Sequence, residues 1–206
     1  MMNDGYISVL NDISSDSPTP GGGTVAALTL SHANSLALMV ARLTIVKDKW
    51  VDGHAIAEEI ILFGNKSMKR SLSLAKEDAE AFDKVMSAYR LSKFDDQEKI
   101  VRKMAILSAT IGAANTPLSI AKESFELLSK LPDLARFGNS NAITDLASSS
   151  ELAYTAIYIA SLNVKINVDS MENDELDNIQ VTSDEILSKS KALIEEIRVI
   201  VAERMS

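Results

Sequence analysis

The chain has 206 residues and a formal net charge of −8, with 46% hydrophobic and only 5% aromatic residues. This length suits one domain, residues 1–206, with a sizeable core, and the composition favours helices over a β-sandwich. The acidic balance argues against nonspecific nucleic-acid binding. The chain contains no cysteine, which excludes disulfides, thiolate metal ligands and a cysteine nucleophile.

Histidine content and the N-terminal residues bear on metal binding and location. The two histidines, His32 and His54, have no histidine partner at metal-ligand spacing, so we expect no bound metal. The N-terminus does not resemble a signal peptide, because Asp4 comes early and no apolar segment follows it. We therefore expect a cytoplasmic protein.

The first predicted elements are a short amphipathic helix over residues 3–14 and a polar linker over residues 14–19. A segment that we call the glycine turn follows, made of Pro20, Gly21, Gly22 and Gly23. Glycines permit positive φ and let another group approach the backbone closely. With Gly23 or Thr24 near the N-cap of the next helix, its free N–H groups could hold an anion or a carbonyl oxygen. The turn matches neither a Walker loop nor Gly-x-Gly-x-x-Gly, and a tight turn before a core helix explains it equally well.

The next predicted helix runs to about Thr44 and carries no charged residue before Arg42. Apolar residues cover nearly every face of it, and a helix of this kind is buried or spans a membrane. Its many alanines and the polar residues in its middle argue against a lipid environment. These polar residues are Ser31, His32, Asn34 and Ser35. We therefore predict a buried central helix and no membrane partner.

Residues 52–90 show a second long helical pattern, which Gly64 could interrupt. Within it, Asp78 interrupts an apolar stripe. The stripe consists of Leu74, Ala81, Val85 and Ala88. A carboxylate on such a face is costly unless it is paired or hydrogen-bonded, so Asp78 is a candidate functional residue. The alternative is that the face turns to solvent at this position.

Residues 97–131 form the next predicted helix, and its charge-free segment 105–121 indicates a second central position. Pro117 is expected to kink this helix or to begin a new one. Pro132 and Asp133 are expected to end it. The sequence therefore predicts a helix that stops before residue 132.

A further helix is predicted from a cap at Asn139 or Ser140 to about Asn163. Asp145 lies on its interior-looking stripe and is a second candidate carboxylate. Asn163 and Asn167 are four residues apart and share a face if the helix continues, whereas capping and helix termination are the alternative roles. Two predicted elements complete the chain, an acidic loop over residues 169–177 and an amphipathic helix over residues 183–204.

Three motifs follow one another along the chain. They are Ser-Pro-Thr-Pro-Gly-Gly-Gly at 17–23, Asp-Ala-Glu-Ala-Phe at 78–82 with Leu-Ser-Lys at 91–93, and Gly138-Asn139 with Asp145 and Asn163-Val-Lys-Ile-Asn167. In this order and spacing they resemble the cyclodeaminase/cyclohydrolase family, over roughly residues 5–170. That family includes the C-terminal domain of formiminotransferase-cyclodeaminase and stand-alone methenyltetrahydrofolate cyclohydrolases.

The resemblance implies an all-α, single-domain antiparallel helical bundle with long buried central helices. It also implies a homodimer that binds a tetrahydrofolate derivative and needs no cofactor beyond that substrate. Two reactions are implied as alternatives. A cyclohydrolase adds water to methenyltetrahydrofolate and yields the 10-formyl form, whereas a cyclodeaminase closes 5-formimidoyltetrahydrofolate to the methenyl form and releases ammonia.

The chain departs from the family pattern at two places. Family members commonly have Leu-Pro-Lys where this chain has Leu-Ser-Lys at 91–93, and often a glycine where this chain has Ile45 and Val46. No formiminotransferase domain is recognised, which favours the cyclohydrolase. A helical dimer that binds folate without turning it over is the remaining alternative.

Both reactions require a base for a nucleophile and an acid for a leaving nitrogen, and carboxylates can serve as both. We expect Asp78 to transfer protons. We expect Asp145 to anchor the pterin, because one carboxylate can accept both the N3–H and the 2-amino group. Asn139, Asn163 and Asn167 are candidates for binding the ring's carbonyl and nitrogens, and the glycine turn for receiving the pterin or the aminobenzoate.

The spacing of two candidates adds a geometric constraint. Asp145 and Asn163 are 18 residues apart, about 27 Å along a continuous helix, so one pterin cannot contact both within one chain. Either the helix breaks or two chains share the site, and we predict an antiparallel pair of chains. Lys93 is the first candidate for binding the acidic folate tail, with a solvated surface charge as the alternative.

Overall fold

The computed structural model describes residues 5–206 and contains no β-strand within them, so the predicted all-α class is confirmed. In this part of the chain the elements are α1 (Tyr6–Ile13), α2 (Gly22–Ile45), η1 (Asp48–Gly53), α3 (His54–Tyr89), α4 (Asp96–Phe137), η2 (Ser140–Ala142), α5 (Ile143–Val168) and α6 (Asp174–Met205). The two η elements are short 3₁₀ segments. The predicted start of the first helix at residue 3 lies outside the described residues.

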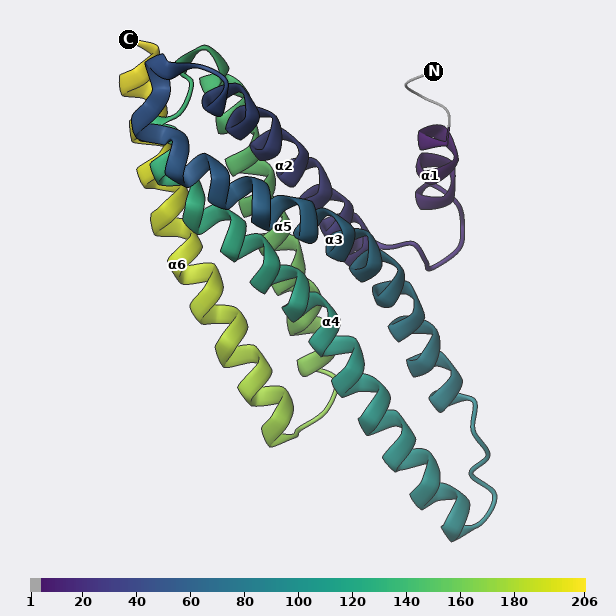
Figure 1. Cartoon of the computed structure of the whole chain (residues 1–206). Coiled ribbons are helices and arrows are strands. Elements are labelled where there is room, and N and C mark those ends of the chain that lie inside the picture. The colour runs from purple at the N-terminus through teal and green to yellow at the C-terminus, as the bar shows by residue number, and fades with distance from the viewer. Residues whose placement is uncertain (1–4) are drawn as a thin grey trace.

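The five long helices, α2 to α6, lie side by side, and the chain passes back and forth along their common axis (Figure 1). The C-terminal end of α3 and the N-terminal end of α4, which one loop joins, project beyond the other helices at one end of the bundle (Figure 1). The short helix α1 stands beside α2, outside the main body.

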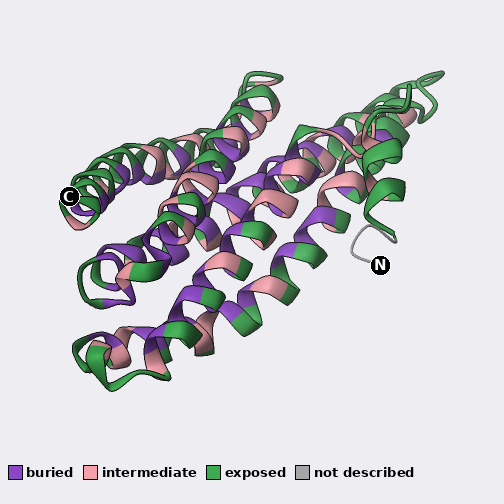
Figure 2. Cartoon of the chain, turned by 90° about the horizontal axis from the view of Figure 1, so that it is seen from above, coloured by how far each residue is buried: buried purple, intermediate pink, exposed green. Residues whose placement is uncertain are grey.

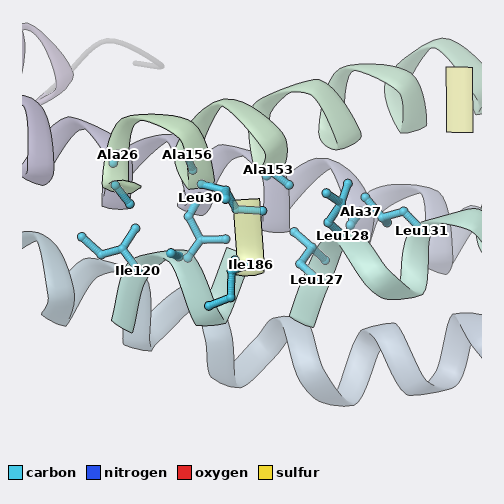
Figure 3. Close-up of a cluster of buried hydrophobic side chains, with 14 of the residues drawn as sticks. Ala26, Leu30, Ala37, Ile120, Leu127, Leu128, Leu131, Ala153, Ala156 and Ile186 are labelled. Carbon is cyan, nitrogen blue, oxygen red and sulfur yellow. The ribbon is translucent and has the colours of Figure 1, made fainter. Parts of the chain in front are cut away.

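The core lies between α2, α4 and α5, where alanines allow the helices to approach closely. Ala26, Ala33 and Ala37 of α2 are completely buried. Leu30 is buried in the same cluster, together with side chains from α4, α5 and α6 (Figure 3). Figure 2 shows that the buried residues lie mainly on the sides of the helices that face one another. Each fully buried leucine contributes about 1.5–3 kcal/mol, so this cluster fixes the helix positions.

The predicted interruption at Gly64 is wrong, because α3 is continuous from His54 to Tyr89. Gly64 is buried, and a Cβ atom there would lie 2.9 Å from Leu38 of α2. The glycine thus permits a close approach between α2 and α3 rather than a break. The cost of a glycine within a helix is offset by this packing.

Both proline signals in α4 were misleading about helix ends. The helix passes through Pro117 and Pro132 and ends at Phe137, so neither a new helix at Pro117 nor a stop at Pro132 is found. Both prolines are buried. Proline removes one helical hydrogen bond, and here the burial of apolar residues on both sides of each proline outweighs that loss.

The last two helices are longer than predicted. α5 continues past Asn163 to Val168, and α6 begins at Asp174 rather than at residue 183. Asn173 caps α6 by accepting hydrogen bonds from the N–H groups of Glu175 and Leu176. Residues 174–177 of the predicted acidic loop are therefore the first turn of α6, where carboxylates interact favourably with the helix N-terminus.

The prediction that α2 is buried on every side is wrong for one face. Exposed residues recur along α2 at helical spacing, at His32, Ser35, Met39 and Leu43. A second exposed apolar row lies on α5, at Tyr158, Leu162 and Ile166. We call these two rows together the α2–α5 face. Tyr6 of α1 contacts this row at His32, and from Ser35 to Leu43 the row on this nearly charge-free helix is exposed.

By length and composition alone, two helices could span a membrane, α2 and α4. The core helix of a soluble protein passes the same test. In the apolar window that qualifies each helix, 56% of α2 and 44% of α4 is buried inside the protein. The finding is thus weak evidence for a membrane span, since packing within the bundle accounts for much of the apolar character.

Candidate functional site

Asp78 lies on α3 directly against the beginning of α2. The hydroxyl of Thr24 is 3.2 Å from Oδ2 of Asp78 and 3.3 Å from the carbonyl oxygen of Ala75, and it can donate to either. The backbone of Thr24 also favours the charged form of this carboxylate. The carboxylate thus lies at the positive end of the α2 dipole, a position that favours an anion. The anion at this helix terminus is a side chain of the protein itself.

Partial burial raises the pKa of the Asp78 carboxyl above its ordinary value of 3.8. The hydrogen bonds from Thr24 act in the opposite direction, because they stabilise the charged form. Desolvation is the larger of the two effects. A carboxyl group with a raised pKa is suited to exchanging protons with a substrate near neutral pH.

The glycine turn is organised by this contact. The N-cap of α2 is Gly21, and the helix begins at Gly22, earlier than the cap expected at Gly23 or Thr24. None of the three glycines has a positive φ. A Cβ atom on Gly23 would lie only 2.2 Å from Oδ1 of Asp78, so Gly23 is required by close approach and not by backbone conformation.

Asn163 of α5 borders the same turn. A Cβ atom on Gly22 would lie 3.5 Å from Nδ2 of Asn163 and 4.0 Å from its Oδ1. The amide nitrogen donates to the carbonyl oxygen of Ile159 at 2.9 Å. The structure therefore brings three predicted site elements together, namely the glycine turn, Asp78 and Asn163.

Two cavities lie along α3, one on each side of Asp78. Successive helical residues are rotated by about 100°, so residues 77 and 81 lie to one side of Asp78 and residues 75 and 79 to the other. Glu77 and Ala81 line a cavity of about 820 Å³ between α3 and α4. Ala75 and Ala79 line a cavity of about 470 Å³ that also includes Pro20 and Thr24. Asp78 itself lines neither cavity, and it lies on α3 between the residues that line the two.

The larger cavity has a charged α3 wall and a small-residue α4 wall. Its charged residues are Glu77, Glu80, Asp83 and Lys84. Its α4 residues are Ala105, Ser108, Ala109, Gly112 and Thr116. Three carboxylates create a negative potential that favours a cationic ligand, and Lys84 is the lining residue able to hold an anionic group.

Lys84 was missed by sequence reasoning, although a signal for it exists. It lies six residues after Asp78, about 9 Å along the helix. Glu77, Glu80 and Lys84 are spaced by three and four residues and thus share one side of α3. Within residues 5–206, Lys84 has no carboxylate within ion-pair distance. Its ammonium group is exposed to solvent at the cavity wall.

Asp145 lies far from Asp78 within one chain. It occupies the first turn of α5, where a carboxylate favours helix formation. Because α5 is continuous from Ile143 to Val168, Asp145 and Asn163 are separated by about 27 Å. A helix break, one of the two predicted solutions, is thus not found. Within residues 5–206 no group of three metal-ligating side chains occurs at either place.

Asn139 is buried at the same end of the bundle as Asp145 and serves the fold. Its Nδ2 donates to the carbonyl oxygen of Leu43 at 3.0 Å, and its Oδ1 accepts from the N–H of Asn141 at 3.0 Å. Its backbone N–H donates to the hydroxyl of Thr44. Asn139 therefore caps η2 and fastens the end of α2, which confirms the cap predicted at this position.

The other two predicted binding residues have contrasting positions. Lys93 is exposed in the loop between α3 and α4, beyond the residues that line the larger cavity. Asn167 lies one turn after Asn163, and its Nδ2 donates to the carbonyl oxygens of Ala113 and Asn163. The structure thus places Asn167 beside the site and Lys93 at the projecting end.

Comparison with known proteins adds independent information. A family model described as formiminotransferase-cyclodeaminase matches residues 6–183. The chain is 34% identical over 165 residues to methenyltetrahydrofolate cyclohydrolase of Methylorubrum extorquens. The aligned region covers 80% of this chain and 79% of that protein. It is 28% identical over 165 residues to formimidoyltransferase-cyclodeaminase of Rattus norvegicus, which covers 80% of this chain but only 30% of that protein.

The fold comparison agrees with the sequence comparison. The structure is similar to the crystal structure of formiminotetrahydrofolate cyclodeaminase from Thermotoga maritima, with a TM-score of 0.78 and 28% identity. That similarity covers 95% of this chain and 92% of the other. The family-model match includes the glycine turn, Asp78 and Asn163, and the matches together confirm the family expected from the three motifs. The chain belongs to the formiminotransferase-cyclodeaminase family.

Proposed function

We propose that the chain is a methenyltetrahydrofolate cyclohydrolase. The relative of that name matches along most of its own length, which supports this choice over the longer two-part enzymes. The structural observation that carries the proposal is the position of Asp78, a carboxylate with a raised pKa held between two cavities. The proposal includes a cytoplasmic location and no cofactor beyond the folate.

The chemistry needs one group that accepts and returns a proton. The methenyl carbon between N5 and N10 is electrophilic because the bridge is cationic. Asp78 takes a proton from water as the hydroxyl adds to that carbon, and it returns the proton to N5 as the carbon–N5 bond breaks. The hydroxyl proton leaves to solvent and the 10-formyl product remains. Carboxylates around the site also stabilise the cationic bridge.

The substrate lies across Asp78 in this proposal. Its one-carbon bridge is at the carboxylate, and its pterin lies toward the glycine turn, where Pro20 lines the smaller cavity. The aminobenzoyl-glutamate portion extends into the larger cavity toward Lys84. A rise of about 9 Å from Asp78 to Lys84 is a length that this portion can span. Lys84 therefore replaces Lys93 as the first candidate for the tail carboxylates.

A second copy of the chain completes the site. The α2–α5 face is apolar and exposed, with Ile166 69% and Leu162 50% accessible, and a second copy would bury it. If two chains oppose their α5 helices in antiparallel fashion, Asp145 of one copy approaches Asn163 of the other. Asp145 then anchors the pterin at a site whose proton-transfer residue belongs to the other chain.

Subunit complementation tests the shared site. Asp78→Asn and Asp145→Asn homodimers are each expected to have little activity, and their subunits are then exchanged. In a heterodimer one of the two shared sites is intact, so the mixture should recover about a quarter of wild-type activity. If both aspartates acted within one chain, neither site would be intact and no activity would return.

The reaction itself is tested with purified protein and methenyltetrahydrofolate near neutral pH. Loss of the substrate's ultraviolet absorbance is measured against the spontaneous rate. Acceleration that Asp78→Asn reduces about 10²–10⁴-fold supports both the reaction and the role of Asp78. Dialysis against a chelator should leave the rate unchanged, since no metal takes part in the proposed steps.

Formimidoyltetrahydrofolate cyclodeaminase is the second candidate. The solved cyclodeaminase from Thermotoga maritima matches 92% of its length, which favours this alternative. The same Asp78 could protonate the departing ammonia. Ammonia release from 5-formimidoyltetrahydrofolate, with no acceleration of methenyl hydrolysis, would select the cyclodeaminase. Folate binding without either turnover would select a binding protein.

A further inference from the structure

Pro117 leaves one carbonyl of α4 without its helical partner. Proline has no N–H group, so the carbonyl oxygen of Ala113, four residues earlier, loses the bond that would close that helical turn. Ala113 and Pro117 are both buried. A buried carbonyl without a hydrogen bond is destabilising, so a donor is needed from outside α4.

Asn167 supplies that donor from α5. Its Nδ2 is 3.1 Å from the carbonyl oxygen of Ala113 and 2.8 Å from the carbonyl oxygen of Asn163. Both hydrogens of the amide are thereby used within the protein. At Pro132 the situation differs, because within residues 5–206 no side chain donates to the corresponding carbonyl of Leu128.

The Asn167 bond joins two parts of the candidate site. On α4, Gly112 and Thr116 line the larger cavity on either side of Ala113 in sequence. On α5, Asn163 lies one helical turn before Asn167 and borders Gly22. One amide group therefore connects the α4 wall of the cavity with the α5 turn beside the glycine turn.

We propose that Asn167 is a positioning residue, which acts through Ala113 and Asn163 and does not contact the substrate. The pair Pro117–Asn167 holds the α4 cavity wall in register with the glycine turn. This inference rests on the proposed function and changes the direct binding role expected for Asn167 from the sequence. A donor provided to Ala113 by another route should make Asn167 dispensable.

A double-mutant cycle tests this substitution of donors. Asn167→Leu removes both amide hydrogens at similar volume, and Pro117→Ala provides a backbone N–H for the Ala113 carbonyl. In the wild-type background, Asn167→Leu should raise KM for methenyltetrahydrofolate about tenfold and change kcat less than about threefold. In the Pro117→Ala background, the same change should raise KM less than about twofold.

Pro132→Ala is the matched control, because it restores an N–H elsewhere in α4. In that background Asn167→Leu should keep its full effect of about tenfold. An equal rise of KM in the wild-type and Pro117→Ala backgrounds would overturn the proposal and indicate direct substrate contact. If wild type is active and Asn167→Leu has the same KM as wild type, the proposal is also overturned.

Unfolding midpoints separate this inference from the proposed reaction. Asn167→Leu should lower the midpoint by about 4 °C in the wild-type background and by clearly less in the Pro117→Ala background. A wild type without turnover on either folate would contradict the proposed function. The midpoints would still support the donor substitution if the two shifts differ, and equal shifts would overturn it.

Discussion

The two ends of α5 carry similar polar side chains in opposite circumstances. Near its beginning, Asn139 is buried and both ends of its amide are bonded to the protein's own backbone. Near its other end, Asn163 faces Gly22, and the adjacent carboxylate of Asp78 lies between two cavities. At one end the polar groups hold the end of α2 to the segment that follows α4. At the other end Asn163 and Asp78 are only partly buried and contact the glycine turn, between the two cavities on either side of Asp78.

The largest expected effect comes from adding one methyl group in the glycine turn. In Gly23→Ala the new Cβ would overlap the Asp78 carboxylate at 2.2 Å, so the carboxylate must move. We expect kcat to fall about 10²-fold, since a small displacement of a reacting group has effects of that size. Steady-state kinetics on the folded variant would measure it.

Gly22→Ala is the control for that change. A Cβ at Gly22 would lie at ordinary contact distance, 3.5 Å, from Asn163. Its kcat should stay within about threefold of wild type. Equal losses for the two variants would mean that the turn as a whole, and not the contact with Asp78, matters for activity.

The second prediction contrasts the two asparagines. Asn139→Ala removes bonds to Leu43 and Asn141 and should lower the free energy of unfolding by about 1–3 kcal/mol. The kcat/KM of its folded fraction should be close to wild type. Asn163→Ala should instead raise KM severalfold with little loss of stability. Chemical denaturation and steady-state kinetics on both variants would measure these effects. A raised KM for Asn139→Ala would mean that Asn139 binds substrate and would contradict the comparison.

A smaller effect is expected for the two lysines near the projecting end. Lys84 lines the larger cavity and Lys93 does not. Lys84→Ala should raise KM about fivefold for the normal substrate, in keeping with an exposed charge contact. With a substrate that lacks the glutamate tail, Lys84→Ala and wild type should have the same KM. An effect of Lys93→Ala that equals that of Lys84→Ala would contradict the proposed orientation.

The smallest effect concerns stability against pH. Because the pKa of Asp78 is raised above 3.8 in the folded chain, the folded state binds more protons than the unfolded state between 3.8 and the raised value. The free energy of unfolding contributed by this group therefore falls as pH rises through that window. Asp78→Asn removes this cost, so its stability relative to wild type should increase as pH rises from about 4 toward neutrality.

Glu77, the neighbouring carboxylate, gives the opposite sign. Hydrogen bonds from Arg70 and Ser73 lower its pKa below 4.5. That group contributes stability above its ordinary pKa, and the contribution is lost as pH falls through the lowered value. Glu77→Gln should thus lose stability relative to wild type as pH rises from acid toward 4.5, and solvent exposure keeps the effect small. Denaturation curves at several pH values would compare both variants.

Some of this arrangement was predictable from local pattern. The helical spacing of Leu74, Ala81 and Ala88 placed Asp78 on an interior-looking stripe, and the structure shows it partly buried there. The cap at Asn139 was predicted from residue type and position. Both features depend on neighbours within a few turns of one helix, which a sequence displays directly.

Features that depend on a second helix were not predictable. The sequence predicted that a group could approach the glycine turn closely, but it could not show that at Gly23 this group is the carboxylate of a residue 55 positions later. Pro117 suggested a helix boundary, because the donor that compensates for it comes from Asn167 on α5. The exposed side of α2 could not be predicted from composition. An apolar helix face can be covered by the same chain or by another chain, and its sequence does not distinguish the two.

The contact between Gly23 and Asp78 also has an evolutionary consequence. A side chain at Gly23 and the native position of the Asp78 carboxylate exclude each other sterically. The two positions should therefore vary as one unit during descent, with a larger residue at the first only where the second has been lost or moved. Inspecting this pair in related chains would separate lineages that keep the proton-transfer geometry from lineages that have abandoned it.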